Sequence, residues 1–122
     1  MLTFELMREK RILIITPAEP LAKADFERLS ETVDPFITEY GPLTGLMIVA
    51  QSFPGWQNFA AMIAHLKFVT NHQRNIKRIA AVADSNIASL LPRIAEHLIH
   101  PDVRQFAYDE KGRALAWLEN GP

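Results

Sequence analysis

The chain has 122 residues, of which 48% are hydrophobic and 22% charged, with a net charge of −1 and no cysteine. This length fits a single domain covering residues 1–122. The near-zero net charge gives no electrostatic basis for binding nucleic acid or an anionic membrane surface. The absence of cysteine excludes disulfides, thiolate zinc sites and thiol catalysis, and it favours a cytoplasmic protein. No apolar run approaches the ~20 residues of a membrane-spanning helix, and residues 1–5 lack the basic region of a signal peptide.

The N-terminal third predicts a strand hairpin followed by a helix. Residues 2–6 alternate apolar and polar side chains, whereas residues 11–16 are nearly all apolar and therefore predict a more central strand. The polar turn between them is short enough for antiparallel pairing. From residue 22 to residue 40, apolar side chains recur every three or four positions, which indicates a helix. We expect Pro35 either to kink this helix or to restart it with Asp34 as N-cap.

The middle of the chain predicts two further strands, each followed by a helix. Residues 45–50 form an unbroken apolar run, which is typical of a strand covered on both faces. A helical pattern follows over residues 56–71. Residues 79–83 predict another buried strand, and residues 87–98 carry a third helical stripe.

The C-terminal segment predicts an edge strand over residues 103–108 and a short helix that Asp109 caps and Gly121 closes. The complete order is then β-β-α-β-α-β-α-β-α. Because strands that alternate with helices are joined by right-handed crossovers, this order predicts an α/β fold. We expect a five-stranded mixed sheet with an N-terminal antiparallel hairpin and with helices packed on the sheet.

Five segments together carry a family pattern that includes the Phe-Pro-Gly-Trp turn after the strand at 45–50. They are residues 53–56, 60–68, 78–84, 103–106 and 114–118. In these segments the chain resembles the SpoIIAA-like family, whose fold is shared by STAS and CRAL-TRIO lipid-binding domains. The resemblance implies a STAS-like fold over nearly the whole chain. It also implies a binding or regulatory domain that is not an enzyme.

Polar and aromatic residues follow the two inner strands at 45–50 and 79–83. The carboxyl ends of neighbouring parallel strands meet at one edge of a sheet, where α/β proteins bind their ligands. We therefore expect a protein partner or a small apolar ligand to bind there. The candidate contacts are Gln51, Ser52, Phe53, Trp56, Asp84 and Ser85. The alternatives are that Trp56 packs the start of the next helix onto the core, and that Asp84 or Ser85 is a helix N-cap.

Ser52 is a candidate phosphorylation site. In anti-sigma-factor antagonists, which this family resembles, a phosphorylated serine lies in an Asp-Ser-Ser-Gly-like turn at the head of the second helix. The corresponding stretch here is residues 51–56, in which Ser52 is the only hydroxyl residue. A phosphate near a helix N-terminus would be favoured by free N–H groups and by the helix dipole. The alternative is a turn serine that binds its local backbone.

The predicted helix at 56–71 has two apolar sides. The main stripe includes Ile63, Leu66 and Thr70, whereas the opposite side is less polar than a solvated face should be. That side favours a homodimer interface. It could instead cover a cavity for an amphipathic ligand, or pack under a neighbouring helix or the C-terminal segment. Its residues are Ala61, His65, Phe68 and His72.

Other common chemistries lack their motifs. His65 and His72 stand two helical turns apart, roughly 10 Å, which is too far for one metal ion. Pro101 places His100 in a loop, away from His97, so we expect no metal site. The sequence contains neither a Gly-x-Ser-x-Gly elbow nor a glycine-rich phosphate loop. We therefore expect no catalytic residues and no cofactor.

Overall fold

A computed structural model describes residues 2–50, 59–83 and 102–121 of the chain. The strands are β1 (Leu2–Met7), β2 (Ile12–Pro17), β3 (Leu43–Ala50), β4 (Ile76–Ala83) and β5 (Asp102–Phe106). The helices are α1 (Lys23–Tyr40), α2 (Phe59–His72) and α5 (Lys111–Asn120), and a short 3₁₀ turn, Gln73–Asn75, follows α2. The helix expected at residues 87–98 lies outside the described residues, as does the start of the helix expected at 56–71.

The strands form one sheet in the order β1-β2-β3-β4-β5. β1 and β2 pair antiparallel, and the other three neighbouring pairs are parallel. The predicted α/β fold with a five-stranded mixed sheet and an N-terminal hairpin is confirmed. β4 begins three residues earlier than the predicted strand, at Ile76, and β5 ends two residues earlier, at Phe106.

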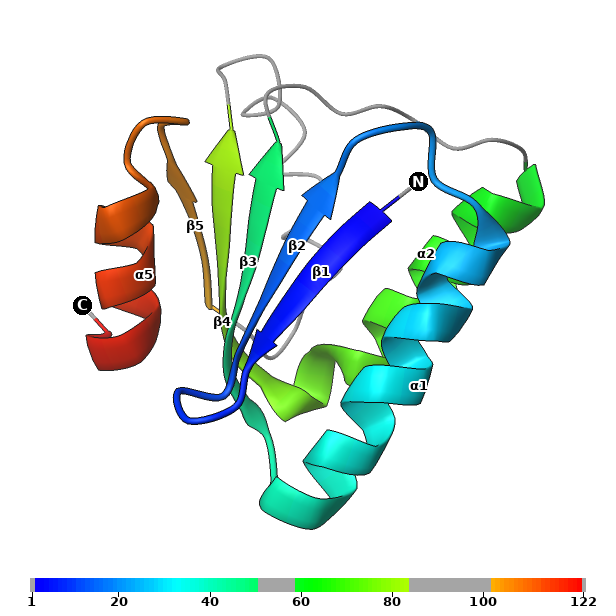
Figure 1. The fold of residues 1–122 in the computed structure, drawn as a ribbon, viewed down its shortest axis with the longest axis horizontal. Helices are drawn as coiled ribbons and strands as arrows, with labels where there is room; N and C mark the ends of the chain where they lie inside the picture. The colour runs from blue at the N-terminus through cyan, green and yellow to red at the C-terminus, as the bar shows by residue number, and fades with distance from the viewer. Residues whose placement is uncertain (1, 51–58, 84–101, 122) are drawn as a thin grey trace.

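Helices cover both faces of the sheet, with α1 and α2 on one face and α5 on the other (Figure 1). Each face has its own apolar core, and β2 contributes to both. Leu13 and Ile15 pack in the core beneath α1 and α2, whereas Ile12 and Ile14 pack in the core beneath α5. Successive side chains of a strand point to opposite faces, so a strand covered twice is apolar throughout. This geometry explains the unbroken apolar runs in β2, β3 and β4.

Of the two outcomes expected at Pro35, a restart at Asp34 does not occur, since α1 runs unbroken through the proline. Val33 and Phe36 on either side are buried in the core and hold the helix on the sheet. Proline removes one backbone hydrogen bond, and packing outweighs that loss here. The N-cap of α5 is Glu110 instead of Asp109. The Glu110 carboxylate accepts a hydrogen bond from the Ala107 backbone N–H at 2.9 Å, which places the turn one residue later.

Candidate functional site

The inner strands β2, β3 and β4 are parallel neighbours and end at the same edge of the sheet (Figure 1). Ala50, the last residue of β3, lies opposite Ala83, the last residue of β4. The segments that follow β3 and β4 therefore start next to each other, at the shared edge that the sequence pattern predicts. The six candidate contacts, Gln51, Ser52, Phe53, Trp56, Asp84 and Ser85, lie outside the described residues.

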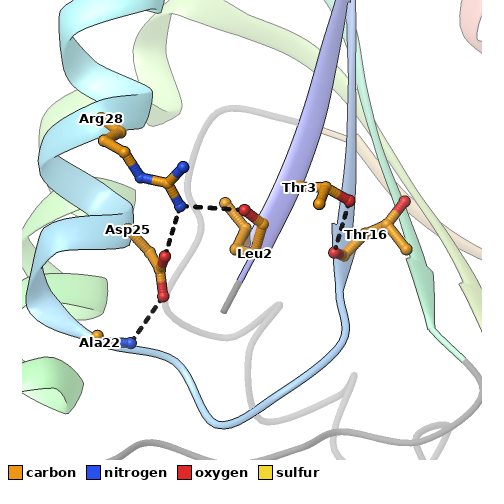
Figure 2. A network of polar contacts seen from close by, with 6 residues as sticks. All are labelled: Leu2, Thr3, Thr16, Ala22, Asp25 and Arg28. Carbon is orange, nitrogen blue, oxygen red and sulfur yellow. Dashed lines mark hydrogen bonds and ion pairs between the residues drawn. The ribbon is translucent and has the colours of Figure 1, made fainter.

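The buried carboxylate of Asp25 forms hydrogen bonds at the described part of this edge, where β1 and α1 begin (Figure 2). Asp25 is 4% exposed, and its Oδ2 accepts a hydrogen bond from the Ala22 backbone N–H at 2.8 Å. Arg28 donates to the Asp25 Oδ1 at 2.7 Å and to the Leu2 carbonyl oxygen at 3.1 Å. Burial by itself raises the pKa of the Asp25 carboxyl, but the Ala22 and Arg28 hydrogen bonds outweigh it and lower the pKa below its usual value. The network fastens the start of α1 to the first strand.

A second contact joins the two strands of the hairpin at the same end. Thr3 Oγ1 donates a hydrogen bond to the Thr16 carbonyl oxygen at 3.3 Å (Figure 2). Thr16 itself is exposed at the end of β2. The edge thus presents hydroxyl groups on a backbone that the Asp25 network holds in place. The sequence analysis missed Asp25. A capping box is recognised by a serine or threonine at the N-cap followed by an acidic residue three positions later, and here the N-cap is Ala22.

The second apolar side of α2 lies against α1 of the same chain. Ala61, Phe68 and His72 are buried, and His65 is partly buried. The His65 ring stacks on Phe26 of α1 with centroids 4.9 Å apart, and Phe68 contacts the same ring at 6.1 Å. His65, Phe68 and His72 thus contact α1 within one chain, and Ala61 is buried. Thr70, expected on the core stripe, is exposed. A homodimer, and the part that these four residues would have in its interface, remains a prediction.

Burial lowers the pKa of the His65 imidazole from 6.5, because the charged ring is poorly solvated beside Phe26. The unfolded chain then binds more protons than the folded one, so the stability that depends on neutral His65 is complete above pH 6.5 and decreases as the pH falls below it. We expect the stability of the wild type to drop relative to His65→Phe between pH 7 and 5 in urea unfolding. Thr70→Ala removes an exposed uncharged side chain, so its stability should change with pH in the same way as that of the wild type. A pH-independent gap between the wild type and His65→Phe would contradict the assignment.

A polar hollow of about 280 Å³ lies between α1 and the end of α2, lined among others by Ser30, Thr38 and Asn71. At its base, His72 Nε2 lies 2.6 Å from Asp34 Oδ1 and Nδ1 lies 2.7 Å from the Phe68 carbonyl oxygen. Both partners accept hydrogen bonds, and the tautomer of the ring decides which nitrogen donates. With both nitrogens engaged, His72 joins α2 to α1 and has no nitrogen left to act as a base on a substrate. His72 and Asp34 are 38 residues apart in the sequence, so no local pattern predicted that they would pair.

The described ranges add two negative findings. Within residues 2–50, 59–83 and 102–121, no three His, Asp or Glu side chains come close enough together to hold a metal ion. Among the same residues, no helix combines the length and the apolar character needed to cross a membrane.

Comparison with known proteins agrees with the topology. The chain superimposes with a TM-score of 0.75 on the crystal structure of an uncharacterized protein of the DUF3478 family from Shewanella loihica PV-4, described as having a SpoIIAA-like fold. The alignment covers 96% of this chain and 93% of that one at 18% sequence identity, a level that shows the shared fold. No curated protein matches the chain. The SpoIIAA-like family profile matches residues 12–119, from the start of β2 to the penultimate residue of α5. The chain therefore belongs to the SpoIIAA-like family.

Proposed function

We propose that this protein is a non-enzymatic STAS-like binding or regulatory module of the cytoplasm. In this proposal, a protein partner or a small apolar ligand docks at the carboxyl edge of β2, β3 and β4. The observation that carries it is the pairing of Ala50 with Ala83, since the segments that follow these residues start from adjacent strands. Open α/β sheets bind their ligands at the carboxyl ends of parallel strands, between segments of this kind.

The residues assigned to contact are Gln51, Ser52, Phe53, Trp56, Asp84 and Ser85. Phe53 and Trp56 would supply apolar contact area, and the others would supply hydrogen bonds to orient the partner. The braced start of α1 supports this assignment, because the Asp25 network keeps the neighbouring part of the edge fixed before a partner arrives. Less ordering is then needed on binding.

Native mass spectrometry of protein purified gently from cells tests the proposal. We expect the wild type to carry a retained small molecule, a partner chain or a second copy, and we expect Trp56→Ala to lose it. Tyr108→Ala is the matched control, because Tyr108 is an aromatic residue that is 44% exposed on a different segment. Identical spectra for the wild type and Trp56→Ala would count against this edge as the site. Turnover of a substrate that disappears in Asp84→Ala would overturn the non-enzymatic role.

The alternative function is a switch controlled by phosphorylation of Ser52. Its support is the position of Ser52 between the end of β3 and the start of α2, where the antagonists that this family resembles carry their serine. Incubation with candidate kinases and measurement of the intact mass decides it. We expect one phosphoryl group on the wild type and none on Ser52→Ala, with Ser30→Ala as a control that still accepts it. A wild-type mass unchanged by the cognate kinase would exclude the switch.

A further inference from the structure

A second hollow, of about 330 Å³, lies between β5 and α5, and its described lining residues come from these two elements and the residue after α5. We call it the α5–β5 hollow. Its main lining residues are Arg104 and Phe106 of β5 and Arg113, Trp117 and Asn120 of α5. Residues 104 and 106 project from the same face of the strand, and residues 113, 117 and 120 recur at helical spacing on one side of α5. Regular secondary structure therefore builds this hollow on both sides.

The apolar part of the hollow is packed. Phe106 is 5% exposed and belongs to the core beneath α5, and the Trp117 ring lies against it with centroids 5.9 Å apart. The Arg104 guanidinium lies over the Phe106 ring at 5.2 Å from its centroid. A guanidinium over an aromatic face is held by a cation–π attraction, so the charge of Arg104 is oriented before any ligand binds.

The charged residues that the structure shows lining the hollow are both arginines, and a carboxylate lies beside one of them. Among the residues that the structure describes, its lining includes two arginines and no acidic residue. Both guanidiniums act on one nearby carboxylate, Glu110, which forms an ion pair with Arg113. The hydrogen bond from the Ala107 backbone is the main reason that the pKa of Glu110 is lowered, and Arg113 and Arg104 lower it further. Two arginines from different elements thus converge near one anionic group. Arg113 lies in the first turn of α5, where the helix dipole also favours an anion.

We propose that the α5–β5 hollow binds a small anion that carries an aromatic ring, with its carboxylate or phosphate between Arg104 and Arg113 and its ring against Trp117. Paired guanidiniums match the oxygens of either anion, and the indole ring provides the stacking surface. The volume is at the lower end of small-molecule sites, which suits a ligand with one ring system. Two sources share this chemistry, namely aromatic carboxylic acids and mononucleotides. The absence of a glycine-rich loop does not bear on this site, because side chains provide its positive charge.

NMR titration of the full chain tests the proposal with indole-3-acetate and adenosine 5′-monophosphate as the probes. We expect at least one probe to shift the backbone amides of residues 104–106 and 113–121. Indole and adenosine, which keep the ring but lack the anion, should bind at least tenfold more weakly. The stronger of the two anionic probes identifies the source of the ligand. Failure of both probes to shift these amides would overturn the proposal.

Four variants separate this site from general surface charge. Arg104→Gln and Arg113→Gln should each weaken the better probe at least fivefold, whereas Lys111→Gln removes an exposed charge from the same helix outside the hollow and should change affinity less than twofold. Glu110→Gln removes the competing carboxylate and should tighten binding at least threefold. Equal weakening by Lys111→Gln and Arg113→Gln would overturn the proposal. Because both arginines are exposed, we expect these variants to fold, and their amide spectra verify it.

Discussion

Leu118→Ala should lower the free energy of unfolding by about 2–5 kcal/mol, the range for deleting a buried leucine side chain. Leu118 is completely buried and packs from α5 onto the core that β2, β3 and β4 form on that face of the sheet. Truncation would leave a cavity between layers that the strands cannot close. Urea unfolding followed by circular dichroism measures the change. Leu115→Ala on the same helix should cost less, because Leu115 is only partly buried.

Gly45 of β3 lies directly beneath Leu118 and allows α5 to approach the sheet closely. A Cβ atom at this position would lie 2.7 Å from Leu118 Cδ2 and 3.0 Å from its Cβ. Gly45→Ala should therefore destabilise the protein by about 1–3 kcal/mol through overpacking. Gly112→Ala is the matched control, because a Cβ there meets nothing within 4 Å and Gly112 lies within α5. It should stabilise by about 0.5–1 kcal/mol, since alanine is the better helix former.

The double variant Gly45→Ala with Leu118→Ala tests the contact itself. Removing the leucine methyl groups makes room for the new Cβ atom, so the combined loss should be smaller than the sum of the single losses by about 0.5–3 kcal/mol. Strict additivity would mean that the glycine is needed for another reason.

The sheet could be predicted because its signals are local. Each inner strand is a short apolar run, and each run is followed by a turn and a helical pattern, so the order of elements and the parallel pairing follow from the chain direction. The shared edge at Ala50 and Ala83 was predictable for the same reason. The resemblance to the SpoIIAA-like family supported the predicted fold but did not indicate a reaction or a ligand.

The packing of α2 could not be predicted in the same way. Both of its sides are rich in apolar residues, and sequence periodicity does not show which side faces the protein. His65 and His72 were assigned to a candidate interface because their side of the helix is less polar than a solvated face, and in the structure His65 stacks on Phe26 and His72 pairs with Asp34. Contacts between residues about 40 positions apart leave no pattern in a single sequence.

The α5–β5 hollow escaped prediction for a related reason. Arg104 and Arg113 are exposed residues nine positions apart on a strand and a helix, and each alone is typical of a solvated surface. Only the crossing of α5 over β5 brings them to the same side as Phe106 and Trp117. A motif requires fixed spacing in the chain, whereas this site depends on the position of one element relative to another.

Asp25→Ala is expected to cost about 1–3 kcal/mol, because it leaves the Ala22 N–H without its carboxylate partner at the start of α1. The loss of the Arg28 contact contributes little of this, since the Arg28 side chain is 49% exposed. Glu27→Ala provides the control on the same helix. Glu27 pairs with Lys23 at 3.8 Å with both side chains well exposed, and its loss should change stability by less than about 0.5 kcal/mol.

The pH dependence of the unfolding free energy distinguishes the contribution of the Asp25 charge from that of its size and hydrogen-bond geometry. Because the folded pKa of Asp25 lies below the ordinary 3.8, the carboxylate contributes its full stability above that value, and the contribution is lost as the pH falls through the folded pKa. Asp25→Asn keeps an oxygen acceptor but cannot ionise. Its deficit relative to the wild type should therefore be constant above about pH 5 and should shrink between pH 5 and 3 in urea unfolding. A deficit that stays constant down to pH 3 would mean that Asp25 acts through its size and hydrogen-bond geometry alone, and that its negative charge does not hold this edge of the sheet together.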